Sequence, residues 1–228
     1  MGYIRKQERI ETTVFDAIEE IADEFDLNIP FYPAVLYLER NVEFEDSGLP
    51  SYFEQDFDNL QGEWDALFIE RPCSIILSSR GIKSSYGEEA THFVHYVNSR
   101  IKKKQRGSSG GEFILCLREM LGFFGSLMLG EERKNRYSQW PDPWSQKAEF
   151  KEFIKQLKKV YTQPIFLVDH IIHQQGYGLG ERLFYAYQNS DISRGEITKL
   201  FKNNFEERYS ARDTFLKFRR RLDWPVKK

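Results

Sequence analysis

The chain has 228 residues, with 33 Lys or Arg and 35 Asp or Glu side chains, and a formal net charge of −2. Aromatic residues make up 15% of it, a share that excludes an intrinsically disordered chain. The charges are unevenly distributed: residues 1–70 hold 18 acidic and 4 basic side chains, a balance of −14, so residues 71–228 carry +12.

The cysteines and the apolar stretches bear on the compartment. Only Cys73 and Cys116 occur, each in or beside an apolar run, which predicts reduced core thiols in a cytoplasmic protein. The first 25 residues alternate charged and apolar side chains, so we expect no signal peptide. The most apolar stretch, residues 113–129, is interrupted by Arg118 and Glu119 and is too short for a membrane span. We therefore expect no membrane partner.

The first part of the chain predicts one helix and a small sheet. Apolar side chains recur at helical spacing over residues 11–25, with Thr12 or Thr13 available to cap the start. Short apolar runs then predict strands, and a loop is expected at 41–62. The predicted strands are 34–39, 66–69 and 74–79.

The rest of the chain is predicted to be helical. A flexible turn rich in glycine and serine, residues 106–111, separates the first two helices. Ser193 and Glu196 form the pattern of a capping box before a later helix. The predicted helices are 86–101, 112–130, 147–161, 164–188, 194–205 and 211–221. A helix, a small sheet and a run of helices, in that order, predict an α+β fold.

The first of these predicted helices contains two of the four histidines. All four fall in two His-x-x-His pairs, His92 with His95 and His170 with His173. Residues three and four apart share a helix face, so Glu88 and His92 project together, with Glu89 one position round. A metal ion needs such convergent donors, and a hydrolytic metal also needs an acid/base group beside it.

The segment Glu88-Glu89-Ala90-Thr91-His92 resembles the active-site helix of the zincin metallopeptidases, whose motif is His-Glu-x-x-His. The resemblance implies that Glu89 is the general base and His92 the second metal ligand. The first ligand differs, because Glu88 stands where the motif has His. A carboxylate there shifts the preference from zinc towards manganese or iron(II), or marks a relic that binds no metal.

A third ligand is expected from the next helix, and Glu119 is the candidate. That helix is apolar nearly all round, which predicts a buried position for its one central carboxylate. A buried charge needs a partner. A downstream glutamate on a second helix is the ligand that the resemblance implies for the gluzincin branch of the zincins. Glu119 could instead pair with Arg118 or another basic side chain.

The second histidine pair belongs to the predicted helix 164–188. If this helix lines the same site, His173 or Tyr177 could donate a hydrogen bond to an oxyanion. The glycine-rich run at 176–180 follows no predicted strand and has the wrong spacing for a dinucleotide-binding loop. We therefore reject dinucleotide binding for this segment.

Each of these residues also has an interpretation that involves no metal or catalysis. Acidic residues favour a helix N-terminus without binding any metal. His95 is expected to be a core or supporting residue, and His170 and His173 could simply line the core. The basic runs 102–106 and 219–221 are interpreted as solvated helix ends, so we expect no nucleic-acid partner.

The leading hypothesis is a metal-dependent hydrolase of the gluzincin type, with peptides or proteins as substrates. The chain would form a single zincin-like domain, 1–228, with the motif helix in 1–101 and a helical half in 102–228. The expected cofactor is a divalent metal, zinc first and manganese or iron next. The alternative is a catalytically inactive relative that binds a partner. A di-metal carboxylate protein is disfavoured, because the sequence has no second Glu-x-x-His.

Overall fold

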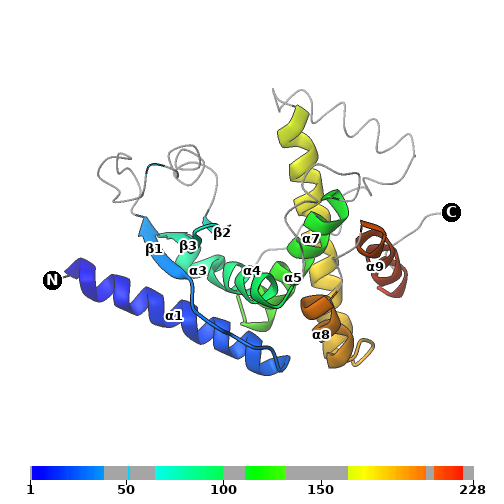
Figure 1. The fold of residues 1–228 in the computed structure, drawn as a ribbon, viewed down its shortest axis with the longest axis horizontal. Coiled ribbons are helices and arrows are strands. Elements are labelled where there is room, and N and C mark those ends of the chain that lie inside the picture. The colour runs from blue at the N-terminus through cyan, green and yellow to red at the C-terminus, as the bar shows by residue number, and fades with distance from the viewer. Residues whose placement is uncertain are drawn as a thin grey trace. The chain divides into compact units, whose positions relative to one another are not determined.

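The structure is a computed structural model, and it describes residues 2–38, 51, 65–99, 111–131, 164–203 and 208–222. The chain forms two compact units, residues 1–99 with 125–133 and residues 100–124 with 134–228. One unbroken helix, α5, contributes its N-terminal part to the second unit and its last turn to the first. Figure 1 shows the elements in order, and the α+β class is confirmed. The prediction of a single domain stays a prediction.

The first unit begins with a long amphipathic helix, α1 (Gly2–Glu24). Its apolar stripe is fully buried at Val14, Ile18 and Ile21. The predicted start near residue 11 was wrong, because Thr12 and Thr13 lie inside the helix and donate their hydroxyls to carbonyl oxygens four residues earlier. A threonine hydroxyl makes this bond inside a helix as readily as it caps one.

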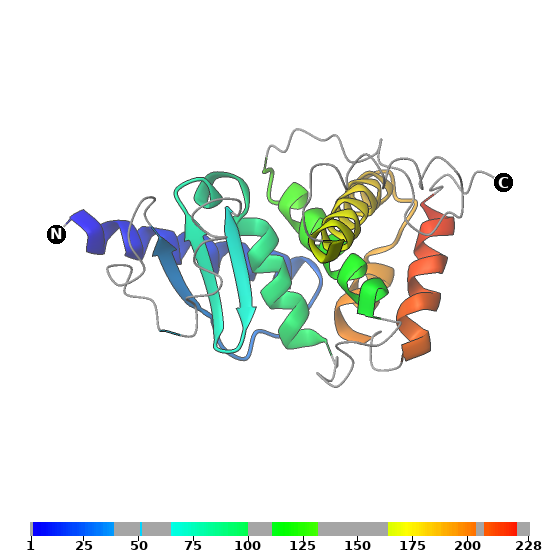
Figure 2. The same cartoon turned by 90° about the horizontal axis from the view of Figure 1, so that it is seen from above.

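Three strands follow, in the spatial order β1-β3-β2. They are β1 (Ala34–Leu38), β2 (Ala66–Glu70) and β3 (Cys73–Ser78). The β1 and β3 strands are parallel, whereas β2 and β3 are antiparallel, so the sheet is mixed. The central strand β3 is the most buried, with Ile75, Ile76 and Leu77 fully covered. Helices α1 and α4 lie against this sheet, as Figure 2 shows.

The helix that carries the motif is α4 (Tyr86–Asn98), preceded by the short α3 (Gly81–Ser84). Every α4 residue from Gly87 to His95 is buried, polar side chains included. Phe93 packs edge-on against Phe68 of β2, with ring centroids 6.1 Å apart, which fixes the face that α4 turns to the sheet. The remaining buried face carries the acidic and histidine side chains.

Helix α5 (Gly111–Met128) ends in the first unit, against α4. A side chain at Gly125 would collide with Thr91: its Cβ would lie only 2.8 Å from Thr91 Cβ and 2.8 Å from Cγ2. Glycine is therefore required for this close approach of the two helices. Gly130 ends the helix with a positive φ of 74°, the conformation typical of a helix C-terminus.

The described part of the second unit consists of the N-terminal part of α5 and three further helices. They are α7 (Pro164–Gln188), α8 (Arg194–Asn203) and α9 (Arg208–Arg221). The predicted capping box is confirmed, because Ser193 N–H donates to Glu196 Oε2 (3.1 Å) and Glu196 N–H donates to Ser193 Oγ (3.3 Å). No helix among the described residues is long and apolar enough to cross a membrane. The predicted helix 147–161 lies outside the described residues, as do all of the predicted loop 41–62 except residue 51 and all of the predicted turn 106–111 except residue 111.

Candidate metal centre

Two of the predicted ligands, Glu88 and His92, lie one turn apart on α4. Their exposed fractions are 4% and 7%, and His92 Nε2 lies 4.0 Å from Glu88 Oε1. The proximity of the two side chains follows from the helix geometry, because residues i and i+4 share a face. Glu88 also lies in the first turn of α4, where the helix dipole favours a negative charge.

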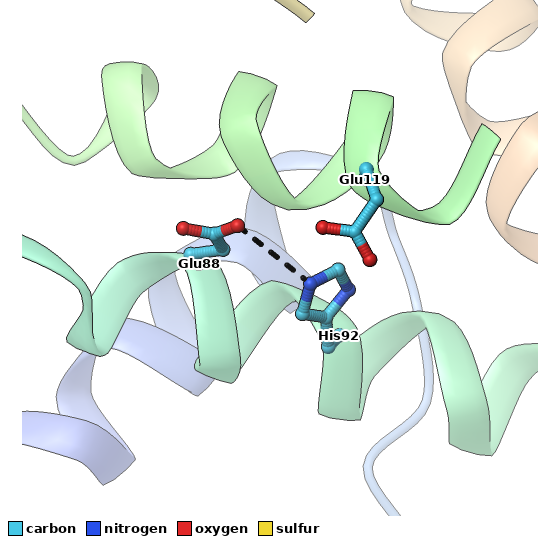
Figure 3. Close-up of side chains that lie close together, drawn as sticks. All are labelled: Glu88, His92 and Glu119. Carbon is cyan, nitrogen blue, oxygen red and sulfur yellow. Dashed lines mark ion pairs between the residues drawn. The ribbon is translucent and has the colours of Figure 1, made fainter. Parts of the chain in front are cut away.

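The third predicted ligand, Glu119, comes from α5 and is 6% exposed. Glu88, His92 and Glu119 each offer one ligand atom, and these atoms all lie within 4.8 Å of one another. Figure 3 shows Glu119 facing the two α4 side chains from the neighbouring helix. The three residues therefore form a buried group that could hold a metal ion.

No protein-family model matches the chain, and neither does any curated protein or solved structure. The zincin resemblance is therefore carried by the motif alone.

The donor set suits a divalent cation. Two carboxylates carry a formal charge of −2, so a divalent ion would leave the group neutral, whereas burying two carboxylates close together is costly without positive charge nearby. One imidazole nitrogen and two carboxylate oxygens are ordinary ligands of zinc, manganese and iron. Three protein ligands also leave a coordination position for water.

The spacing is near the range that coordination needs. Two ligands at about 2.0–2.1 Å from a tetrahedral ion lie roughly 3.4 Å apart, so ligand atoms within 4.8 Å of one another need to close by up to about 1.4 Å. The three residues are therefore a group that could hold a single ion once their ligand atoms draw together.

The other candidate residues lie on α4 and α7. Glu89 is buried beside Glu88 on α4. His173 on α7 places Nδ1 3.0 Å from Glu119 Oε2. Tyr177, one turn further along α7, lies with its ring 6.3 Å from His173 and 5.2 Å from Phe123 of α5. The roles predicted for Glu89, His173 and Tyr177 stay predictions.

The remaining histidines are placed as follows. His95 is 1% exposed on α4 and does not belong to the group of convergent ligand atoms found among the described residues. The side chain of His170 lies outside the described residues. The partner found for Glu119 on α7 is a histidine.

One buried residue of the site region, Glu131, was missed by the sequence analysis. Its Oε1 accepts a hydrogen bond of 2.8 Å from the Gly87 N–H in the first turn of α4, where Ser85 makes no side-chain cap. Burial and the charges of Glu131 and Glu20 raise the pKa of Tyr86. Glu131 thus joins the end of α5 to the start of α4, the helix that carries Glu88 and His92. No local pattern points to it, because the two ends are 44 residues apart.

Proposed function

We propose that this protein is a divalent-metal-dependent hydrolase that uses Glu88, His92 and Glu119 as protein ligands and acts on peptides. The observation that carries the proposal is the convergence of these three buried side chains from two helices. Two carboxylates and one imidazole, with a coordination position left for water, are the donor set of a catalytic rather than a closed structural site.

The chain supplies the remaining groups. A bound divalent ion would lower the pKa of its water towards neutrality and polarise the substrate carbonyl. Glu89, adjacent to Glu88, would accept the proton of the attacking water and pass it to the leaving amine. Tyr177 or His173 would donate to the carbonyl oxygen as it gains negative charge. These roles rest on the motif resemblance together with the burial of Glu89 and the contact of His173 with Glu119.

Zinc is the first metal to test, with manganese and iron(II) next. The oxygen-rich donor set favours the harder ions more than a set with two histidines does. The measurement is the metal content of protein purified without chelator, followed by calorimetric titration of the metal-free protein with Zn²⁺ and Mn²⁺. We expect one equivalent of metal.

Matched variants make this experiment specific. Glu119→Gln and His92→Ala each remove one ligand and should abolish stoichiometric binding, whereas Glu8→Gln, an exposed change on α1, should not alter it. Glu89→Gln should keep the metal and lose peptide hydrolysis. Folded wild-type protein that binds none of these metals would contradict the proposal.

Glu88 favours a second candidate, a catalytically inactive protein that binds a partner. The motif has histidine at this position, and a carboxylate there weakens the zinc preference. Glu88→His separates the two functions. Gain of tight zinc binding and peptide hydrolysis would show an otherwise intact site, whereas no gain of either would favour the inactive relative.

A further inference from the structure

The contact between His173 and Glu119 defines a second layer around the candidate metal centre. His173 Nδ1 lies 3.0 Å from Glu119 Oε2, and the exposed side-chain fractions are 38% for His173 and 8% for Glu119. His173 is not among the residues whose ligand atoms converge in the described part of the chain. It therefore touches a candidate ligand rather than the position of an ion.

Two glycines of α7 allow this helix to approach α5 closely enough for the contact. A Cβ at Gly176 would overlap Glu119 Cβ and lie 2.9 Å from the Cys116 carbonyl oxygen. A Cβ at Gly180 would lie 2.5 Å from the Met120 carbonyl oxygen and 2.9 Å from Phe123 Cβ. The backbones of the two helices therefore touch at Gly176 and Gly180.

The spacing of His173 and Gly176 along α7 links this helix packing to the position of the imidazole. His173 precedes Gly176 by three residues, so both lie on the face that meets α5. Because the missing side chain of Gly176 lets α7 approach Glu119 Cβ closely, the His173 imidazole lies within hydrogen-bond distance of the carboxylate. The glycine-rich run 176–180, which is not a dinucleotide loop, thus has a packing function.

We propose that His173 is a positioning residue that donates from Nδ1 to Glu119 and thereby sets the affinity of the site for its metal. The proposal rests on the proposed function, since it assigns Glu119 as a ligand. A carboxylate that is already ordered loses less side-chain entropy when it binds an ion, and Glu is among the side chains that lose the most entropy on ordering. The bond to Oε2 leaves Oε1 for the ion. Groups that orient a metal ligand in this way typically contribute about 10- to 100-fold in affinity.

A consequence of this arrangement is that metal binding and the packing of α7 are coupled. Both depend on the orientation of Glu119, and a coupling between two equilibria is reciprocal. A metal bound at Glu119 should therefore strengthen the attachment of α7, and a change that loosens α7 should weaken the metal.

The test compares two amides at position 173. The Asn amide nitrogen reaches nearly the position of Nδ1, whereas the Gln amide nitrogen lies nearer that of Nε2. We expect His173→Asn to bind Zn²⁺ and Mn²⁺ within about threefold of wild type, and His173→Gln and His173→Ala to bind about 10- to 100-fold more weakly in calorimetric titrations. Gln188→Ala, an exposed change on the same helix, is the control and should bind as wild type does.

The outcomes separate this inference from the proposed function. If wild-type protein binds no metal, the metal site itself is absent. If wild type binds tightly and Glu119→Gln does not, but His173→Ala and His173→Gln bind as wild type does, the positioning role alone is overturned. Equal weakening by Asn and Gln would also overturn it, because the two amides differ only in reach. Far-UV circular dichroism of every variant shows whether its fold is retained.

Discussion

Replacing Gly125 by Ala adds only a methyl group, and it should weaken metal binding through a steric clash. A Cβ at this position would lie 2.8 Å from Thr91 Cβ and 2.8 Å from Cγ2, in addition to its overlap with Oγ1. Carbon atoms pack favourably at about 3.5–4.0 Å, so α4 and α5 must separate locally by roughly 0.7 Å or more. Overpacking of this kind costs about 1–3 kcal/mol, and the higher helix propensity of Ala returns up to about 1 kcal/mol.

The separation acts directly on the candidate ligands. Glu119 lies six residues before Gly125 on the same helix, and its partners Glu88 and His92 lie on α4. Closing the added gap with two side-chain torsions moved off their rotamers costs about 1–3 kcal/mol. That cost corresponds to roughly 5- to 150-fold weaker binding. We therefore expect a lower midpoint of urea unfolding, and a lower affinity for Zn²⁺ in calorimetric titration.

The matched control for this change is Gly195→Ala on α8. A Cβ there has no atom within 4 Å, so the same substitution should leave metal affinity unchanged and stabilise the fold slightly. Thr91→Gly combined with Gly125→Ala should recover metal affinity relative to Gly125→Ala alone, because the double change removes the clash. Unaltered stability and affinity in Gly125→Ala would refute the steric argument.

Three further predictions concern other contacts. Glu131→Ala removes the acceptor of the buried Gly87 N–H and should cost about 2 kcal/mol in urea unfolding; a change below 0.5 kcal/mol would contradict the capping role. The hydrogen bond from the Ser193 backbone N–H lowers the pKa of Glu196. The wild type should therefore have a higher free energy of unfolding than Glu196→Gln above pH 4.5, and this difference should disappear as the pH falls through the lowered pKa. A difference that does not depend on pH would contradict this prediction. Burial raises the pKa of the Cys73 thiol from 9.0 to about 11. At pH 8 the thiolate is then about 100-fold scarcer, while each thiolate is about tenfold more nucleophilic. Iodoacetamide should therefore label Cys73 roughly tenfold more slowly than a free cysteine peptide, and labelling at the free-cysteine rate would refute the shift.

The elements that could be predicted are those with a local signal. Periodic apolar residues indicated the helices, and the spacing of Glu88 and His92 placed them on one face because helix geometry is invariant. Glu119 could be predicted because a carboxylate in an otherwise apolar helix needs a buried partner.

The contacts that could not be predicted join distant parts of the sequence. Glu131 and Gly87 are 44 residues apart, and neither residue type signals the other. The fit of Gly125 against Thr91 depends on where two helices cross, which the sequence pattern of either helix leaves open. The start of α1 was misplaced because threonine has two competing hydrogen-bonding habits, and the structure uses the one inside the helix.

The glycines at the helix crossings constrain the fold independently of any metal. Gly125, Gly176 and Gly180 are required by backbone clearance, whatever the neighbouring side chains do chemically. Replacing any of them by a larger residue would require α4 or α7 to move against α5, whether or not the acidic and histidine side chains bind an ion. The glycine spacing is therefore a property of the backbone packing, and it would persist in a protein of this fold with a different site chemistry.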